Sequence, residues 1–598
     1  MIPRLWRISL LFGLIATCSY SQYNVLTFHG DRQRTGWISS ETILTPASVS
    51  GGSFGPVWNS PPLDSVTIGG VTYPPHLYAS PLYVDGVTMT GGQYAGASFH
   101  VVYAGSSNGF VYAVNASTIT RPRSIAAGTV LWRTQINTPT GSFDGGIPLG
   151  ILGTPVIDLA AAPPRLYVAS ADAVQGWQVF AIDIANGSIL PGWPLNIHGD
   201  TLAPINQNGP AAWQGTLQMS QRGGLNLSPD GRLLYVPFGA YNDLATGWMI
   251  AVDTQTPALA SAFSGAPSTV ASANGGMWAS GGAAVDNNGN LYSTTGNGTT
   301  DTTNVPGYWG QSVLVWGPGT PLKLAGTYTP WNYCQMDAGD IDLAGGAAVI
   351  VPDLPAADTS TPHLITFGGK QGNQYLVDRD HMPGSLMARA ACRNDPSTEQ
   401  SLVPPGPQPQ FGEPGPLNVF GPYSDTYGSV DYAKGRSTGA FFRAADGSNF
   451  LFVSGSSKAA VDSETTVPPC IVKLRIVTSP GKPAYLAVEA SESTFGFLSP
   501  GSPWVTSNGP NNAVVWVVVA NVPRSASLVG PGVSHPILYA LDPVTLQALW
   551  ISTPAMLNVG GKYNAPAFGR GMVFVGTDRI QAFGMVRGRL PARERPRR

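Results

Sequence analysis

Short runs of alternating large apolar and small or polar residues cover most of the chain, and many come in pairs joined by a tight turn. One pair spans residues 101–115, VVYAGSSNGFVYAVN, with Asn108 and Gly109 at its centre. Alternation with a period of two predicts strands, and Asn-Gly tolerates the positive φ of a hairpin turn. Both faces of the second run are largely apolar. Such a strand needs neighbours on both sides, so the pattern predicts stacked or radially arranged sheets.

The same pattern recurs at intervals of roughly 40 to 60 residues, which is typical of a β-propeller or a solenoid. Each repeat offers up to four short strands, the content of one propeller blade. We count eight repeats, which begin at Ala79, Gly153, Leu225, Gly281, Gly345, Ser437, Asn512 and Tyr563. We therefore expect an all-β fold, a single β-propeller of four-stranded blades over residues 22–584.

The eighth repeat stops after its third strand, whereas a strand near the N-terminus has no partner. This strand lies in residues 53–63, SFGPVWNSPPL, and contains Trp58. Pairing the two ends of the chain in one sheet would complete the last blade and remove exposed edges. We predict an eight-bladed ring closed in this way. A seven-bladed ring, with the sixth repeat as a decoration, is the alternative.

Several repeats share a phrase in which an Asp or Asn is followed by a turn and then by a Trp. The carboxylate or amide can bond backbone amides of the turn, and the Trp can cover the next sheet. These are roles in packing the blades, not in chemistry. We assign them to Trp58, Trp132, Asp183, Trp193, Asp542 and Trp550.

The composition supports this fold and excludes some classes of binding partner. The chain has 73 Gly and 53 Pro, with 11% charged and 43% hydrophobic residues, which is typical of a turn-rich, folded β protein. A formal net charge of -2 gives no long-range attraction to nucleic acid or to an anionic membrane. No stretch reaches the roughly 18 apolar residues of a transmembrane helix. We expect a monomer without a nucleic-acid partner and without a transmembrane segment.

The two ends of the chain differ from the repeats. Residues 1–21 have a basic start, an apolar run that ends at Ala16, and then small and polar residues, which is the pattern of a signal peptide. We therefore expect export to the periplasm or out of the cell, with lipid anchoring at Cys18 as the alternative to cleavage near Ser21. Residues 585–598 are rich in Arg, and we expect a disordered tail.

The remaining cysteines, Cys334, Cys392 and Cys470, have separations that fit no zinc or redox motif. In an oxidising compartment one disulfide can form. We favour Cys334 with Cys392, which leaves one thiol free. A buried, unreactive cysteine remains open for each of them.

The densest polar stretch is residues 334–346, CQMDAGDIDLAGG, which precede the first strand of the fifth repeat. Loops at this place in a propeller face the central channel. Asp337, Asp340 and Asp342 are therefore candidates to bind a cation, although they do not match the full calcium-loop pattern; capping of turns is the other interpretation. Lys370, in the next hairpin, could reach the same channel mouth or be solvated.

An insertion rich in proline occupies residues 394–428. Proline cannot donate to a sheet ladder, so we expect a surface loop, with one mouth of the channel as the place it would cover. The seven His are dispersed without an HExxH pair, and no GxSxG follows a predicted strand as a nucleophile elbow. Neither a zinc hydrolase nor a serine esterase is indicated.

These repeats resemble those of the pyrroloquinoline quinone-like, or quinoprotein alcohol dehydrogenase-like, β-propellers. The match extends over most of residues 23–584, and residues 25–49, VLTFHGDRQRTGWISSETILTPASV, look like the segment before the first blade in bacterial secreted members. The resemblance implies pyrroloquinoline quinone and calcium as the cofactors to consider. Alcohol-oxidising members resemble one another in a disulfide between adjacent cysteines, which this chain lacks. No calcium ligand or catalytic base can be transferred by motif.

Three functions follow as hypotheses. The leading one is a binding or scaffolding module in the cell envelope or outside the cell, with an envelope protein or an extracellular polymer as partner. The alternative is a quinone- and calcium-dependent dehydrogenase of an alcohol or a sugar, with the quinone in the channel. The further alternative is a polysaccharide-binding propeller that uses exposed aromatic residues on one rim, such as Trp278 or Trp309.

Overall fold

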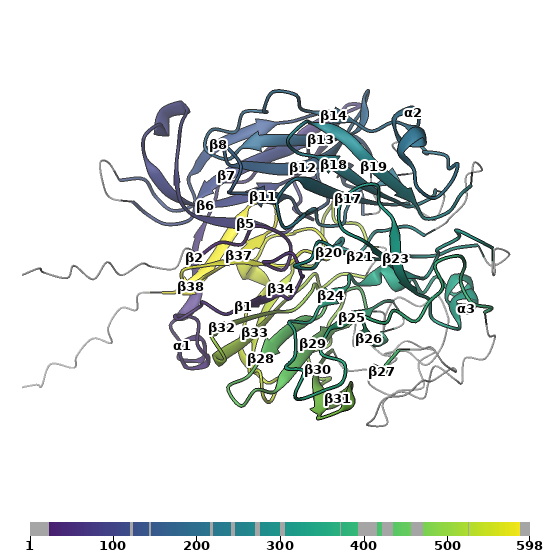
Figure 1. Ribbon diagram of the computed structural model, residues 1–598. Coiled ribbons are helices and arrows are strands. Elements are labelled where there is room, and N and C mark those ends of the chain that lie inside the picture. Colours follow the sequence, from purple (N-terminus) through teal and green to yellow (C-terminus); the bar gives the residue numbers. More distant parts are fainter. Residues whose placement is uncertain are drawn as a thin grey trace, which may run out of the picture.

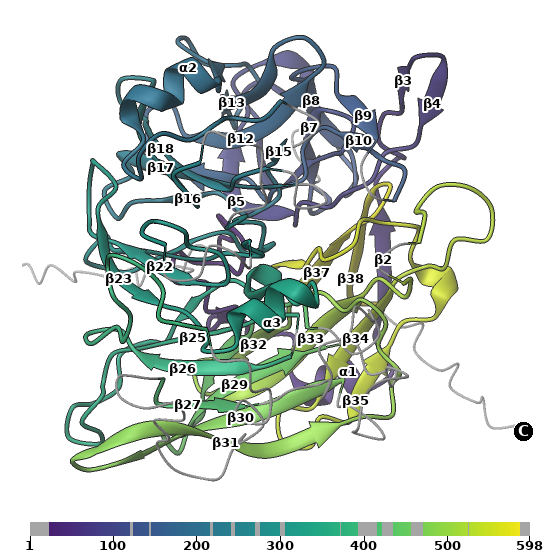
Figure 2. The same cartoon turned by 90° about the vertical axis from the view of Figure 1, so that its right-hand side faces the viewer.

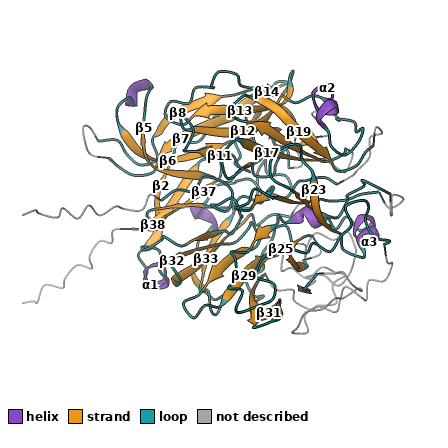
Figure 3. Cartoon of the chain, viewed as in Figure 1, coloured by secondary structure: helices purple, strands orange, loops and turns teal. Residues whose placement is uncertain are grey.

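Eight antiparallel sheets stand in a ring in the computed structural model, and each forms one blade (Figures 1 and 3). Figure 2 views the ring from the face that carries helix α3 (Tyr333–Ala338). The structure describes residues 23–586 apart from 120–123, 143–144, 216–218, 241–244, 269–274, 300–304, 371, 393–415, 421–434, 456–469 and 524–525. The first strand of each blade lies at the channel, and the later strands follow outward.

Blades 1 to 4 follow one another along the chain. Blade 1 consists of β5 (Leu82–Thr88), β6 (Ser98–Gly105), β7 (Phe110–Asn115) and β8 (Val130–Gln135). Blade 2 consists of β11 (Val156–Asp158), β12 (Arg165–Asp172), β13 (Gly176–Asp183) and β14 (Leu195–Asn196). Blade 3 consists of β16 (Asn226–Leu227), β17 (Leu233–Ala240), β18 (Trp248–Asp253) and β19 (Ala258–Ser264), and β15 (Met219–Ser220) also pairs with β17. Blade 4 consists of β20 (Ala284–Val285), β21 (Leu291–Thr294), β22 (Val313–Trp316) and β23 (Leu324–Tyr328).

Blades 5 to 8 complete the ring. Blade 5 consists of β24 (Val349–Ile350), β25 (Leu364–Gly368), β26 (Gln374–Asp378) and β27 (Asn418–Phe420). Blade 6 consists of β28 (Ala440–Arg443), β29 (Asn449–Ser454), β30 (Ile471–Ser479) and β31 (Lys482–Glu492). Blade 7 consists of β32 (Trp504–Asn508), β33 (Asn511–Val519), β34 (Ile537–Leu541) and β35 (Ala548–Ile551), with β1 (Trp37–Ile38) parallel to β32. Blade 8 consists of β36 (Ala567–Gly569), β37 (Met572–Gly576), β38 (Ile580–Met585) and β2 (Phe54–Asn59).

The smaller elements lie outside the blades. They are the ribbons β3 (Val66–Ile68) with β4 (Val71–Tyr73) and β9 (Thr140–Ser142) with β10 (Pro148–Leu149), the helices α1 (Pro46–Ser50) and α2 (Gly199–Leu202), and the 3-10 turns at Gly92–Tyr94, Ala203–Ile205, Leu343–Gly345 and Pro554–Met556. In the described part of the chain, no helix combines the length and the apolar character needed to cross a membrane.

The predicted all-β propeller with eight blades is confirmed. The sixth repeat forms a complete four-stranded blade, so the seven-bladed alternative is wrong. Residues 101–115 form most of β6 and β7, the second and third strands of blade 1, as their alternation indicates. One segment differs from expectation: residues 418–420, inside the proline-rich range 394–428, form the outer strand of blade 5. Residues 394–415 and 421–428 of that range lie outside the described part of the chain, as do residues 1–21 and 587–598.

The N-terminal strand closes the ring as predicted. Strand β2 runs antiparallel to β38, with Phe54 opposite Met585 and Trp58 opposite Ala582. The indole nitrogen of Trp58 also donates to the carbonyl oxygen of Ala116, 3.1 Å away in blade 1. Strands from the two ends of the chain therefore share one sheet. This pairing completes blade 8 and closes the ring.

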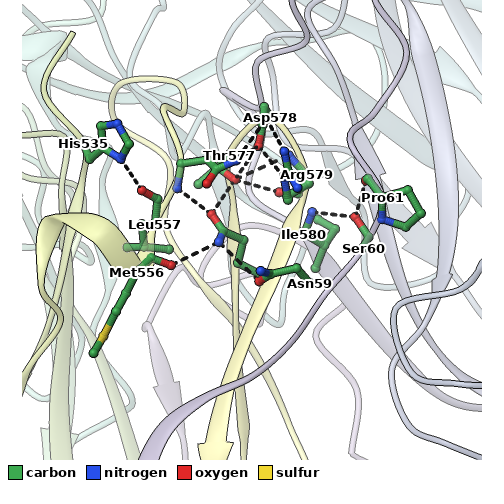
Figure 4. Close-up of polar contacts among 12 residues, drawn as sticks. Asn59, Ser60, Pro61, His535, Met556, Leu557, Thr577, Asp578, Arg579 and Ile580 are labelled. Atoms are coloured by element: carbon green, nitrogen blue, oxygen red, sulfur yellow. Dashed lines mark hydrogen bonds and ion pairs between the residues drawn. The ribbon is translucent and has the colours of Figure 1, made fainter. Parts of the chain in front are cut away.

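A buried glutamine, Gln581, joins three parts of the chain at this closure. Figure 4 labels three of its partners, Asn59, Met556 and Thr577. Gln581 Nε2 donates to Asn59 Oδ1 at 3.3 Å and to the Met556 carbonyl at 3.1 Å. Gln581 Oε1 accepts from Asn558 N at 2.7 Å and from Thr577 Oγ1 at 2.9 Å. A primary amide has two donors and two lone pairs, so every bonding position is used. We call these five residues the closure seam.

The side chains that we assigned to packing make contacts with turns, with neighbouring strands or with the next blade. Each carboxylate accepts from a backbone amide of its turn, and each indole meets a carbonyl or an aromatic ring. The contacts are Asp183 with Ala185 N (2.8 Å), Asp542 with Val544 N (2.9 Å), Trp132 Nε1 with the Ile184 carbonyl (3.0 Å), and the ring centroids of Trp193 with Tyr167 (5.5 Å) and of Trp550 with Phe54 (5.0 Å).

The segment before β2 makes a circuit of the channel and contacts all eight blades in turn. Its contacts are Val25 O with Tyr83 N (3.0 Å), Leu26 O with Ile157 N (2.8 Å), Thr27 Oγ1 with Leu225 O (2.9 Å), Arg32 O with Val285 N (2.8 Å), Gln33 O with Ile350 N (3.0 Å), Thr35 O with Phe441 N (2.7 Å), Gly36 O with Val505 N (2.8 Å) and Glu41 Oε2 with Gly571 N (3.1 Å). We call residues 23–41 the channel plug, because they tie the inner strands together at one end of the channel.

The interior of the plug is polar and almost fully buried. The Arg34 guanidinium donates to Thr27 Oγ1 at 2.6 Å and to the carbonyl of Leu225 at 2.9 Å. His29 stacks on Phe28 with ring centroids 4.5 Å apart, and burial lowers the pKa of His29 to about 3. The imidazole is therefore neutral at physiological pH, and the plug acts as a structural closure.

Hydroxyl groups join the inner strands just before they reach the plug. Each accepts a hydrogen bond from a backbone amide of an adjacent blade. The four bonds are Ser80 N to Thr154 Oγ1 (3.0 Å), Ala565 N to Ser80 Oγ (3.0 Å), Thr438 N to Ser502 Oγ (2.9 Å) and Ala347 N to Thr438 Oγ1 (3.1 Å). We call Ser80, Thr154, Thr438 and Ser502 the hydroxyl ring.

Candidate functional site

Buried polar residues gather where blades 3, 4 and 5 approach the channel. Asp340 and Asp342 come before the inner strand β24, whereas Ile350, which bonds to the plug, ends that strand, so these residues and the plug lie at opposite ends of the inner strand. We call this group the channel cluster; its members are Arg222, Trp278, Asn297, Gln311, Asp340, Asp342 and Lys370.

Lys370 is the cation at the centre of this cluster. It follows β25, and its backbone N donates to the Asp342 carbonyl at 2.9 Å. Its Nζ is 2.7 Å from Asp340 Oδ1 and forms a second ion pair with Asp342 Oδ2. Only 4% of the residue is exposed, so Lys370 is not the solvated hairpin charge that the sequence left open. The structure brings it together with two of the three predicted aspartates.

Trp278 supplies the aromatic surface of the cluster. The Arg222 guanidinium lies 4.5 Å from the centroid of its ring and Lys370 Nζ lies 5.3 Å away, both within the range of cation–π attraction. Trp278 is 8% exposed and Trp309 is 1% exposed. Neither residue is an exposed platform for a sugar, so the residues named for a polysaccharide-binding rim do not form one.

A chain of amides fixes the orientation of Asn297. The Leu343 N–H donates to Gln311 Oε1 at 2.8 Å, so the amide nitrogen of Gln311 faces the other way and donates to Asn297 Oδ1 at 2.7 Å. Asn297 therefore turns its own amide nitrogen toward Asp340 Oδ1, 3.2 Å away. The Asn297 backbone N donates to Asp342 Oδ1 at 2.6 Å. Both groups of Asn297 that face the carboxylates are donors.

The backbone of the cluster is held in an uncommon conformation. Gln311 has a φ of 55° and Asp340 has a φ of 52°, in the left-handed region that non-glycine residues seldom occupy. Glycine permits the close approach nearby: a Cβ on Gly296 would lie 2.7 Å from Asp342 Oδ1 and 2.8 Å from Trp278 Nε1. Strain of this kind gathers at functional sites, where the surrounding structure enforces it.

Asp337 lies apart from the other two aspartates, on α3. Its Oδ1 accepts from Gly298 N at 2.8 Å, and its Oδ2 is buried without a hydrogen-bond partner among the described residues. Burial raises the pKa of Asp337 to about 7, against the opposing effect of the Gly298 bond and the Arg389 charge. The carboxyl group therefore titrates near neutral pH. The structure places Asp337 in the same loop system as the cluster but not with Lys370.

The predicted disulfide between Cys334 and Cys392 is present, with the Cα atoms 6.0 Å apart. It ties α3 to the segment that carries Arg389, whose guanidinium lies 4.2 Å from the centroid of the Tyr333 ring. Cys470 is free and buried, and burial raises the pKa of its thiol to about 12. Cys470 is therefore the unreactive buried cysteine of the sequence alternatives.

The residues of the cluster do not fit a resident calcium ion. Calcium takes six to eight oxygen ligands that converge on one point. Here the Lys370 ammonium lies between Asp340 and Asp342, and Asn297 presents nitrogen rather than oxygen. Across the ranges that the structure describes, no three His, Cys, Asp or Glu side chains come together as a metal site. The three predicted aspartates therefore do not act together as ligands.

Comparison with known proteins shows the fold. No protein-family model matches the chain, and no curated protein matches its sequence. Among solved structures, quinohemoprotein alcohol dehydrogenase from Comamonas testosteroni has a TM-score of 0.55 at 15% identity, with 95% of this chain and 81% of that chain covered. A quinohemoprotein alcohol dehydrogenase from Pseudomonas putida HK5 has a TM-score of 0.56 at 13% identity, with 96% and 82% covered. A europium-containing methanol dehydrogenase has a TM-score of 0.53 at 14% identity, with 93% and 90% covered. The predicted quinoprotein-like propeller is confirmed as a fold.

Sequence reasoning missed Arg222, Asn297 and Gln311, and it gave Trp278 a different role. Asn297 had one visible signal, the flanking glycines in TTGNGTT, which permit the close backbone approach. Arg222 and Gln311 carry no local signal. Their place in the site follows only from the way blades 3 to 5 meet.

Proposed function

We propose that this protein is an exported binding propeller whose channel cluster holds a small planar ligand that carries carboxylate or carbonyl oxygens. The observation that supports this most is the Arg222 guanidinium over the ring of Trp278, beside the ion-paired Lys370. An arginine presents planar N–H donors that match carboxylates. A quinone is the first ligand class to test, because two solved structures with this fold are named as quinohemoprotein alcohol dehydrogenases.

Burial gives a second reason to place the ligand here. Lys370 and Asp342 hold charges inside the protein, and removing such charges from water costs free energy that their pairing only partly returns. A fold that needed only stability could replace them with apolar residues. Groups of this kind, together with a carboxyl such as Asp337 whose pKa is displaced, are typical of functional sites.

Titration with pyrroloquinoline quinone, followed by tryptophan fluorescence and quinone absorbance, tests the proposal. We expect saturable uptake of one quinone per chain. The Arg222→Gln variant should bind about tenfold more weakly or worse, the loss of roughly 1.4 kcal/mol expected for a charged contact. The matched control is Arg232→Gln, because Arg232 is an exposed arginine paired with Asp253 at 3.4 Å. Equal affinity in both variants, or no uptake of the quinone or of other planar carboxylates, overturns the proposal.

The export part of the proposal is supported by the sequence of residues 1–21, which has the basic start and apolar run of a signal peptide. The first described contact is Tyr23 N to Asp85 Oδ2, at 3.0 Å. Cleavage near Ser21 would leave the whole channel plug in place, and a lipid on Cys18 would leave a short tether before it. Fractionation of cells that express either the full chain or a chain without residues 1–21 tests whether these residues direct export and whether the protein stays attached to the membrane. An envelope protein or an extracellular polymer as a further partner is tested by pull-down from envelope fractions.

A dehydrogenase is the second candidate, and Asp337 favours it. A carboxyl group that titrates near neutral pH can accept a proton from a substrate hydroxyl, which is the role of a general base. Dye-linked oxidation of alcohols and sugars by the quinone-loaded protein, compared with Asp337→Asn, separates the two candidates. Turnover that Asp337→Asn abolishes supports the enzyme. Quinone binding without turnover leaves the binding propeller.

A further inference from the structure

The ammonium group of Lys370 is saturated by oxygen acceptors. Its Nζ donates to Asp340 Oδ1 at 2.7 Å and to the Asp340 carbonyl at 3.2 Å, and it contacts Asp342 Oδ2. An ammonium has three N–H bonds, so these three oxygens account for all of them. The group is therefore held in place by the protein rather than free to swing toward a ligand.

Those three oxygens form the kind of set that usually surrounds a hard metal ion. Two carboxylate oxygens and one backbone carbonyl converge on one point from a single loop, residues 340–342. Calcium and magnesium sites use the same mixture of carboxylate and carbonyl oxygens. In this chain the point is taken by the Nζ of Lys370, which arrives from the turn after β25.

The surroundings agree with an ammonium rather than a metal. Both Asn297 groups that face the carboxylates are hydrogen-bond donors, and their orientation follows from the backbone N–H of Leu343 through Gln311. A metal would need the Asn297 oxygen to turn inward, which would break the bond to Gln311. The Trp278 ring on the other side of Lys370 favours an organic cation over a strongly hydrated metal ion.

We infer that the Lys370 ammonium is the resident cation of the channel cluster, in the place of a divalent metal, and that ligand binding there is independent of metal. The part about ligand binding rests on the proposed function; the part about the cation does not. Lys370 positions Asp340 and Asp342 and neutralises them, so the cluster is complete in protein that contains no metal.

The experiment replaces the ammonium and asks whether a metal takes its place. In the wild type, 1 mM calcium and 1 mM EDTA should give the same thermal midpoint, and equilibrium dialysis against calcium should show no stoichiometric site. In Lys370→Met, Asp340 and Asp342 lose their counter-ion. Calcium should then bind, and it should raise the thermal midpoint by about 2 °C or more, reversibly with EDTA. The double variant Lys370→Met with Asp342→Asn should lose this response.

Controls separate the inference from general effects of the substitution. Lys323→Met removes an exposed lysine from blade 4 and should leave calcium without effect. Lys370→Arg keeps the charge and should also bind no calcium. Stoichiometric calcium binding by the wild type that Asp342→Asn abolishes would overturn the inference, and this measurement holds even if Lys370→Met fails to fold. Failure of quinone uptake would overturn the proposed function alone, because the calcium measurements use no ligand.

Discussion

At the closure seam, Gln581 is neutral, and each of its donors and lone pairs has a partner. In the loops of the channel cluster, a lysine and two aspartates carry charge into the interior, and Asp337 on the neighbouring helix keeps a buried oxygen without a partner in the part of the chain that the structure describes. The central side chain of each region, Gln581 or Lys370, is buried, and both regions are assembled from distant parts of the chain. A satisfied neutral network adds stability, whereas charges that are buried cost stability even when they are paired, as Lys370 and Asp342 are.

The backbone shows the same contrast. The closure seam is centred on an antiparallel pair of strands, β2 with β38, whose register shifts once, between Pro56 and Trp58. The channel cluster depends on two non-glycine residues with positive φ, Gln311 and Asp340. The ring is therefore closed by the pairing of two strands, whereas the channel cluster is held by loops that contain left-handed backbone.

The largest effect is expected at the closure seam. Gln581→Leu should lower the free energy of unfolding by about 4 kcal/mol, because four hydrogen bonds that contribute about 1 kcal/mol each are lost. Urea unfolding followed by tryptophan fluorescence measures this. The matched control is Gln547→Leu, an exposed glutamine with one hydrogen bond to Glu492, which should cost less than about 1 kcal/mol. Similar losses of unfolding free energy in the two variants would show that Gln581 contributes no more to stability than an exposed glutamine does.

The disulfide on the channel side should have the next largest effect. Replacing Cys334 and Cys392 with Ser opens a loop whose ends are 58 residues apart, which should cost about 3 kcal/mol. Reductant should destabilise the wild type by the same amount and leave the double variant unchanged. Because the disulfide anchors α3, quinone affinity should also fall in the double variant, whereas it should not fall in Gln581→Leu under conditions where that variant is folded. Equal quinone affinity in the wild type, the double variant and Gln581→Leu would show that α3 does not contribute to the quinone site.

The architecture could be predicted from the sequence, because local patterns of residues determine where its strands and turns form. Alternation, turn residues and their recurrence predicted eight blades, and the missing fourth strand of the last repeat predicted closure by β2. Elements without such a pattern were missed. Strand β27 has three residues in a proline-rich range, and β32, the first strand of blade 7, precedes the repeat start expected at Asn512.

The site could be predicted only in part, because its residues meet across blades. Asp340, Asp342 and Lys370 were found because they lie in consecutive channel-facing loops of one blade. Arg222 comes from blade 3, and it joins them only through the way neighbouring inner strands pack. The channel plug was also missed, since it is held mainly by backbone hydrogen bonds, which leave no trace in the side-chain pattern.

The smallest effect is expected from Asp337, and it depends on pH. Because burial raises its pKa to about 7, the folded state holds the proton more tightly than the unfolded state, where the pKa is about 3.9. Stability from this group is therefore present at low pH and is lost as pH rises from about 4 through about 7, with a loss of about 1 kcal/mol between pH 6 and pH 7. Asp337→Asn should remove this dependence, as shown by the difference in unfolding free energy between the two proteins across that interval.

The control is Asp230→Asn: hydrogen bonds from Ser228 and Arg232 lower the pKa of Asp230, so its contribution changes only below pH 4. Parallel profiles for wild type and Asp337→Asn would mean that the buried oxygen of Asp337 is solvated, and the contrast with the closure seam would then rest on Lys370, Asp340 and Asp342 alone.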